Sequence, residues 1–331
     1  MEIVEKLYKT IRKHSPSSIA IDVTSKCNFK CLHCFNESGQ IREGDLSDEE
    51  FNNAIEQIKD LHPVSVCLCG GEPFMQFNRV INALKLLNGN VGQVNIVSNG
   101  WFATYDNLSE IKKLGVHTYQ VSLDGKNAFQ HDNFRGVSGA FEHVINAIKI
   151  AREVGLQPVV AVTPNKFNHK SIMEIIDMCF DLGVTFVRSM PLIPMGRGAK
   201  NQRLILTSDE YITYQTELRK AKEKYQYRMA IEWGDPMDHL IRMPINAKDG
   251  IYTYEIDIKS NGDIVPSIYF PITVGNIKTM SLKECWENGF NLIWDNKQLL
   301  SLIGDIEDLY DFRDFFDKIG TGKKILLEID K

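Results

Sequence analysis

Apolar and polar positions along the first two thirds of the chain follow two different periods. Between six runs rich in β-branched residues lie segments whose apolar residues recur every three or four positions, as in FNRVINALKLL and KSIMEIIDMCFDLG. The runs are typical of buried strands and the segments of amphipathic helices. The strand-like runs fall at about 18–24, 64–69, 93–97, 117–123, 158–163 and 184–190. This alternation predicts an α/β fold with a parallel sheet, and it leaves open whether the sheet is open or curled into a full or partial barrel.

The alternation stops after about residue 191. The segment LIPMGRGAKNQR, rich in Gly, Pro and basic residues, predicts a loop, and residues 207–226 predict a helix. Further on, YEIDIKSNGDIVPS predicts two strands around an Asn-Gly turn. We therefore expect an N-terminal helix over residues 1–16, a core over 17–200 and a mixed α+β C-terminal extension over 201–331.

Composition narrows the setting. The chain has 331 residues, of which 43% are hydrophobic, enough for one large or two modest domains. Its net charge of -5 gives no reason to expect broad nucleic-acid affinity, and no apolar run is long enough to cross a bilayer. The N-terminal segment lacks the apolar core of a secretion signal, and the odd number of cysteines, seven, argues against a disulfide framework. We expect a cytoplasmic protein that binds neither nucleic acid nor membrane.

Three of the cysteines, Cys27, Cys31 and Cys34 in CNFKCLHC, follow the first expected strand, where parallel α/β folds place their chemistry. The segment between them is polar, which disfavours inert, packed thiols. A structural zinc ion normally takes four protein ligands, and no cysteine pair at the usual spacing completes such a set. A redox dithiol of Cys31 and Cys34 would leave Cys27 without a role. An iron–sulfur cluster on three thiolates fits best, because its fourth iron stays open for a substrate or cofactor.

The spacing Cys-x3-Cys-x2-Cys resembles the signature of the radical S-adenosylmethionine (radical SAM) superfamily, with His33 at a position that is commonly aromatic. Four later blocks add to the resemblance: CGGEPF, IVSNG, VSLDG with HDNFRG, and VRSMPLIPMGRG. The resemblance implies a parallel (β/α)6 partial TIM-type barrel and one [4Fe–4S] cluster on Cys27, Cys31 and Cys34. It also implies that the remaining iron is chelated by the amino and carboxylate groups of S-adenosylmethionine (SAM).

The same resemblance implies a set of cofactor-binding residues at the ends of later strands. These are Gly70, Gly71, Glu72, Pro73, Asn99, Ser122, Asp124 and Arg135. Glu72 and nearby backbone carbonyls are expected to accept from the SAM ammonium, while Ser122 and Arg135 are expected to hold the SAM carboxylate. Asn99 and Asp124 have two interpretations, contact with the ribose or capping of a turn.

Other notable side chains carry simpler interpretations. Cys67 and Cys69 share one face of the second strand, and packing is the favoured role for both. Arg197 is interpreted as either a substrate-binding or a surface arginine, and the surface role is favoured. Cys285 falls on an expected helix and is interpreted as a packed thiol, with hydrogen-atom donor as the alternative.

The C-terminal extension resembles the SPASM type, which usually carries cysteines for auxiliary clusters. Here Ser267 occupies the place of an expected cysteine, and only Cys285 remains beyond Cys179. One cysteine cannot hold a cluster of the usual all-thiolate kind. A single cluster is therefore expected.

The resemblance implies that a flavodoxin or ferredoxin supplies an electron, that SAM is cleaved, and that the resulting 5′-deoxyadenosyl radical removes a hydrogen atom from the substrate. A ribosomally made peptide is the favoured substrate, as in peptide modification of the SPASM-type branch. A small-molecule substrate or maturation of another protein is the alternative. A second class, a non-catalytic iron–sulfur or zinc protein, is disfavoured because it needs no clamp for a zwitterion. If the substrate has a leader peptide, it is expected to dock on the C-terminal region or on another protein.

Overall fold

The computed structural model describes residues 14–234, 236–304, 306–307, 311, 314–315, 318 and 325–329. The chain divides into two compact units, and each contains segments that are distant in sequence. Unit 1 comprises residues 1–25, 41–94 and 236–331, and unit 2 comprises 26–40 and 95–235. Of the helix expected over residues 1–16, all but the last three residues lie outside the described part.

Unit 1 combines two strands from the start of the chain with strands of the C-terminal extension. Strand β1 pairs in parallel with β2 on one side and with β8 on the other, and β8 and β9 form an antiparallel hairpin that β11 extends. The strands are β1 (Ser18–Asp22), β2 (Ser65–Cys69), β8 (Glu255–Ile258), β9 (Asp263–Val265) and β11 (Gly275–Asn276). A separate parallel pair consists of β10 (Ile272–Thr273) and β12 (Ile325–Leu326).

The helices of unit 1 show the local signals that the sequence carries. Helix α2 begins after Ser47, whose side chain accepts from the Glu50 amide while Glu50 accepts from the Ser47 amide, a capping box. Its buried residues follow the helical period, so one apolar face lies on the core. The unit contains α2 (Asp48–Asp60), η1 (Pro73–Gln76), α3 (Phe77–Leu87), α10 (Pro236–Lys248), α11 (Leu282–Glu287), η3 (Phe290–Asp295) and α12 (Lys297–Ile303).

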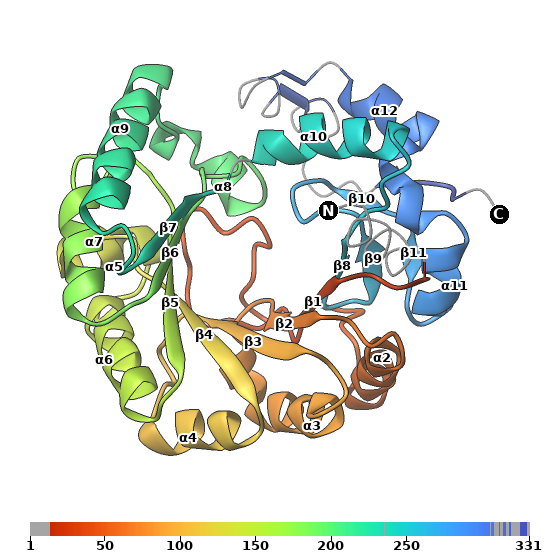
Figure 1. Cartoon of the computed structure of the whole chain (residues 1–331), viewed down its shortest axis with the longest axis horizontal. Helices are drawn as coiled ribbons and strands as arrows, with labels where there is room; N and C mark the ends of the chain where they lie inside the picture. The colour runs from red at the N-terminus through yellow and green to blue at the C-terminus, as the bar shows by residue number, and fades with distance from the viewer. Residues whose placement is uncertain are drawn as a thin grey trace. The chain divides into compact units, whose positions relative to one another are not determined.

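Unit 2 contains four consecutive parallel strands, β4 to β7, with helices between them. Each strand pairs with the next in parallel, and Figure 1 shows α4, α6 and α7 on the same side of these strands. The strands are β4 (Val116–Ser122), β5 (Gln157–Val162), β6 (Phe186–Ser189) and β7 (Ala230–Trp233), and β3 (Gln93–Ser98) spans the boundary between the units. The helices are α4 (Tyr105–Lys113), α5 (Ala128–Arg135), α6 (Ala140–Glu153), α7 (Ile172–Asp181), α8 (Arg197–Lys200), η2 (Gln202–Leu204) and α9 (Ser208–Lys224).

All six expected strands are present as β1 to β6, and the helices expected between them are α2, α3, α4, α6 and α7. The helix expected over 207–226 is α9, and the Asn-Gly hairpin is β8 and β9. The pattern did not predict α5, β7 or α10. The compact units also divide the chain differently from the three expected segments, because β7 pairs with β6 and β8 pairs with β1.

No helix in the described part of the chain is both long and apolar enough to cross a membrane.

Candidate cofactor site

The loop with the three clustered cysteines lies in unit 2 and is held by backbone hydrogen bonds. The Cys27 amide donates to the Gly39 carbonyl at 2.7 Å, and the Leu32 amide donates to the Phe134 carbonyl at 2.9 Å. None of these three cysteines is part of a disulfide. Cys31 is buried and the other two are half-buried, and the apolar surroundings of the loop include Phe29, Ala140 and Trp101.

Nitrogen donors point at two of these sulfur atoms. The Phe29 amide lies 3.4 Å from Cys27 Sγ, and Asn99 Nδ2 lies 4.0 Å from the same atom. Arg135 Nη1 lies 3.8 Å from Cys31 Sγ. Donors in this arrangement stabilise the thiolate, which is the form of cysteine that binds iron. The donor set and its N–H contacts therefore fit an iron–sulfur cluster.

Burial raises the pKa of the Cys31 thiol, and the positive charge of Arg135 opposes that shift. Among the described residues, no three His, Cys, Asp or Glu side chains are grouped as ligands of one metal ion. The thiolates of an iron–sulfur cluster each bind a different iron, so they need not converge on one point.

Arg197 ties the cysteine loop to the chain beyond β6. Its Nε donates to the Cys31 carbonyl at 2.8 Å and its Nη1 donates to the Ser38 carbonyl at 2.8 Å. Its own amide donates to the Cys34 carbonyl at 3.0 Å. The favoured interpretation of Arg197 as a surface arginine is therefore wrong, because a half-buried guanidinium with two carbonyl acceptors is part of the loop's support.

Gly136, at the end of α5, allows another close approach to the loop. Its φ is +68°, and a Cβ atom at this position would lie 2.6 Å from the Lys30 carbonyl oxygen. A side chain therefore has no room, and the left-handed backbone conformation itself favours glycine. This contact accounts for the glycine that closes the HDNFRG block.

Arg135 and Asp124 form a buried ion pair beside Cys31. Arg135 Nε donates to Asp124 Oδ2 at 2.6 Å, and Nη2 contacts the same oxygen. The Asp124 Oδ1 atom accepts from the Thr163 amide at 2.7 Å. Burial alone would lower the pKa of Arg135, but the attraction of Asp124 outweighs it, the net shift is upward, and the guanidinium stays charged. The roles of Arg135 at the SAM carboxylate and of Asp124 at the ribose stay predictions.

Two other expected contacts follow β3 and β4. Asn99 Oδ1 accepts from the Trp101 amide at 2.9 Å, a contact that agrees with the turn-capping interpretation of Asn99. Its Nδ2 also donates to Asn28 Oδ1 at 2.8 Å, within the cysteine loop. Ser122 is the half-buried last residue of β4, and its role at the SAM carboxylate stays a prediction.

The segment Gly70–Pro73 lies in unit 1, after β2. Gly70 has a φ of +119°, and the Gly71 amide donates to the Thr24 carbonyl at 2.8 Å. The Glu72 side chain is wholly buried, and its Oε1 accepts from the Phe74 amide at 3.1 Å at the start of η1. Binding of the SAM ammonium by this segment stays a prediction.

Sequence reasoning did not single out His131, which lies beside the ion pair. His131 is wholly buried on α5, and its Nδ1 accepts from the Asp124 amide at 3.0 Å. Burial and the nearby Arg135 lower its pKa to about 3, so the ring is neutral. In the sequence, His131 lies one helical turn before Arg135, and this spacing could have predicted that the two side chains share a face of the helix. His33 stacks on Phe134 with 4.2 Å between ring centroids, and its pKa is lowered well below the usual value, chiefly by burial.

The other cysteines each have surroundings of their own. Cys69 Sγ donates to Asp22 Oδ1 at 3.6 Å, beside the half-buried Cys67. Cys285 on α11 is wholly buried, which supports its interpretation as a packed thiol, and the hydrogen-donor role stays a prediction.

Comparison with known proteins relates both sequence and fold to one superfamily. A sequence model described as "Radical SAM superfamily" matches residues 21–182. A probable GTP 3′,8-cyclase from Saccharolobus islandicus is 30% identical over 221 residues, 63% of this chain and 68% of that protein. An AdoMet-dependent heme synthase from Methanosarcina barkeri is 26% identical over 319 residues, 89% of each chain. The sporulation killing factor maturation protein SkfB from Bacillus subtilis is 26% identical over 227 residues, 68% of this chain and 54% of SkfB.

The fold is similar to that of solved radical SAM structures. Streptococcus suis SuiB, solved with its precursor peptide SuiA, superposes with a TM-score of 0.69 at 18% identity, covering 91% of this chain and 73% of SuiB. The expected fold class, an α/β fold with a parallel core of the partial TIM-barrel type, is confirmed by this likeness. Together with the matched sequence region and the cyclase, these similarities show that the chain belongs to the radical SAM superfamily.

Proposed function

We propose that Cys27, Cys31 and Cys34 hold the [4Fe–4S] cluster that radical SAM enzymes use together with SAM. The observation that carries this proposal is the set of three cysteines on one loop, with N–H donors directed at two of the sulfur atoms. When bound, the cluster supplies one electron that cleaves SAM to methionine and a 5′-deoxyadenosyl radical, which abstracts a hydrogen atom from the substrate. The protein's part is to bind, orient and shield the reactants.

The contacts with SAM follow from the same proposal. The backbone carbonyls of the Gly70–Pro73 segment and the Glu72 carboxylate receive the ammonium, and Ser122 receives the carboxylate. Asn99 holds the cysteine loop through Asn28 and caps its own turn, so its support of the cofactor is indirect. A flavodoxin or ferredoxin in the cytoplasm supplies the electron.

The hypothesis of a peptide substrate is supported by the similarity to SkfB, a maturation protein that aligns with 68% of this chain. The same hypothesis includes a degenerate SPASM-like extension. In this extension the buried Ser267 occupies the place of an expected cysteine. A ribosomally made peptide would then be modified at an unactivated C–H bond without an auxiliary cluster.

A tetrapyrrole is the second candidate substrate, and the length of the alignment favours it. The heme synthase from Methanosarcina barkeri aligns with 89% of this chain and over 89% of its own length, whereas SkfB aligns over 54% of its length. An alignment over 89% of the chain reaches into the C-terminal third, the region from which a segment that covers the substrate would come. The relative that acts on a small molecule therefore aligns over a larger share of both chains than the peptide maturation protein does.

The test of the shared chemistry is anaerobic reconstitution with iron and sulfide, followed by SAM and dithionite. We expect 5′-deoxyadenosine and methionine in equal amounts, detected by liquid chromatography and mass spectrometry. The variant with Cys27, Cys31 and Cys34 all changed to Ala is the control and should form neither product. A wild-type protein that carries the cluster and yields no 5′-deoxyadenosine would contradict the proposal.

The substrate class is tested by adding an iron tetrapyrrole with propionate side chains to the reconstituted enzyme. Faster 5′-deoxyadenosine formation and a new tetrapyrrole mass would support the small-molecule candidate. An unchanged rate and an unaltered tetrapyrrole would leave the peptide candidate as the favoured one.

A further inference from the structure

The ion pair of Asp124 and Arg135 is an unusual feature for the interior of unit 2. Asp124 has no exposed surface and Arg135 is 8% exposed. A buried ion pair gives little net stability, because removing both charges from water costs about as much as their attraction returns. Its presence beside a cysteine of the proposed cluster therefore calls for a role other than stability.

The pair has a definite orientation. Its positive end faces the cysteine loop, because Arg135 Nη1 is directed at Cys31 Sγ at 3.8 Å. Its negative end faces away, because Asp124 Oδ1 accepts from the Thr163 amide at the end of β5. His131, which contacts the Asp124 amide, has a pKa of about 3 and adds no charge.

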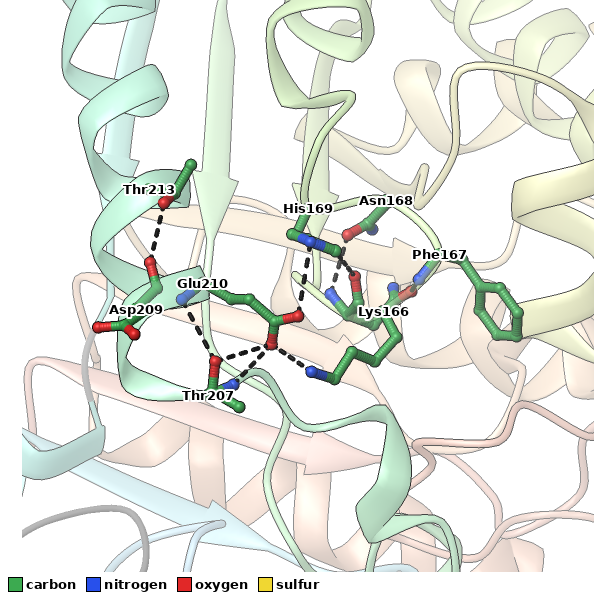
Figure 2. A network of polar contacts seen from close by, with 9 residues as sticks. Lys166, Phe167, Asn168, His169, Thr207, Asp209, Glu210 and Thr213 are labelled. Carbon is green, nitrogen blue, oxygen red and sulfur yellow. Dashed lines mark hydrogen bonds and ion pairs between the residues drawn. The ribbon is translucent and has the colours of Figure 1, made fainter.

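The loop that holds Asp124 is itself held in place. Asn168 Nδ2 donates to the Asp124 carbonyl at 3.0 Å and to the Thr163 carbonyl at 2.9 Å. Asn168 belongs to the loop after β5, and Figure 2 shows this loop joined to the start of α9, where the Glu210 carboxylate lies between Lys166 and His169. Asp124 is thus held through its amide, its carbonyl and its Oδ1 atom, and can keep the arginine in one orientation.

We propose that Arg135 raises the reduction potential of the cluster on Cys27, Cys31 and Cys34, and that Asp124 is the positioning residue that directs Arg135 at Cys31. This inference rests on the proposed function. Reduction adds one electron to the cluster, so a nearby positive charge stabilises the reduced form more than the oxidised form. An N–H donor to a ligand sulfur acts in the same direction.

The test is a reductive titration of the SAM-free, reconstituted protein with titanium(III) citrate, in which each cluster takes up one electron and the reduced form is followed by electron paramagnetic resonance. Arg135→Gln removes the positive end and should lower the equilibrium constant for reduction about tenfold, which is about 59 mV for a one-electron couple. Asp124→Asn keeps a side-chain oxygen that can accept from Arg135 and so position it, but removes the opposing negative charge, and it should shift the potential the other way. The double variant should lie closer to wild type than the Arg135→Gln variant.

Opposite shifts separate this role from a structural one. Loss of packing would alter cluster loading in both single variants without moving their potentials in opposite directions. Arg197→Gln is the matched control, because it removes a guanidinium of α8 that bonds to the Cys31 carbonyl and not to the Cys31 sulfur. A shift in that control as large as in Arg135→Gln would overturn the role of the N–H contact.

The remaining outcomes are also decisive. Asp124→Asn keeps the arginine and nearly the same side-chain volume, so its upward shift carries the test if Arg135→Gln assembles no cluster. Unchanged potentials with weaker SAM binding in Arg135→Gln would overturn the inference and support the carboxylate-binding role instead. A wild-type protein that takes up no iron would refute the proposed function itself, which iron and sulfide analysis detects before any titration.

Discussion

At the scale of single residues, the three clustered cysteines have different surroundings. Cys27 Sγ accepts from the Phe29 amide, which belongs to the loop itself, whereas Cys31 Sγ faces an arginine 104 residues away in sequence. Cys34 contributes its carbonyl, which accepts from the Arg197 amide. The loop is thus shaped both by its own backbone and by distant side chains.

Gly70 allows a residue-scale prediction. With a φ of +119°, a Cβ at this position would lie 2.7 Å from the Thr24 carbonyl oxygen, closer than real Cβ atoms come. We expect Gly70→Ala to lower the free energy of unfolding by about 1–3 kcal/mol, measured by urea unfolding, because backbone strain and the clash add. Gly89→Ala is the matched control, with a φ of +76° and open space around it, and should cost less. Equal effects of the two substitutions would show that the close approach to Thr24 is unimportant.

At the scale of elements, the loop after β5 and the first turn of α9 are joined through one carboxylate. Glu210 accepts from the Thr207 amide at 2.8 Å as part of a capping box and also pairs with Lys166. Hydrogen bonding from Lys166 first, and from the Thr207 amide second, lowers the pKa of Glu210 to about 2. One side chain therefore caps a helix and fixes the loop that supports Asp124.

The shifted pKa gives this contact a defined pH dependence. A carboxyl group whose pKa is lower in the folded protein stabilises it at pH values above the ordinary value of 4.5, and this stabilisation is lost as the pH falls toward about 2. We expect Glu210→Gln to lower the free energy of unfolding by about 1 kcal/mol near pH 7, as loss of a helix cap does. The gap between variant and wild type should narrow below pH 4.5 in urea unfolding.

Glu217→Gln is the control on the same helix. Glu217 pairs with Lys220 on an exposed face, where an ion pair contributes little. A gap for Glu210→Gln that stays constant with pH would contradict the charge-dependent contact.

At the scale of the whole molecule, the C-terminal extension supplies strands to both compact units. β7 pairs with β6 in unit 2, and β8 pairs with β1 in unit 1. Its one cysteine, Cys285, is wholly buried, as is Cys179 on α7, and burial raises the pKa of each thiol to about 12. Thiols in such apolar surroundings are poor iron ligands.

We therefore predict one cluster per chain. Reconstituted protein should contain about four irons and four sulfides. Changing Cys27, Cys31 and Cys34 to Ala should remove the iron and the brown colour, whereas changing Cys179 and Cys285 to Ala should leave both unaltered. Eight irons per chain, or loss of iron in the control variant, would contradict this prediction.

The sequence by itself determined the order and kind of the core elements, the clustered cysteines and the superfamily. Hydrophobic period reports which side of a segment is buried, and that is a local property, so β1 to β6 and the helices between them could be predicted within a few residues. The cysteine spacing is likewise local. It needed no tertiary information to be recognised.

Only the tertiary structure decided which distant segments meet. Arg197 bonds to a carbonyl 166 residues earlier, and β8 pairs with β1 across more than two hundred positions. The Asp124 and Arg135 pair spans 11 residues, yet its direction toward Cys31 depends on how α5 packs beside the loop. Such contacts depend on how whole helices and strands pack, and they produce no periodic pattern in the sequence. The local sequence pattern could therefore identify these residues as candidates but could not predict their partners.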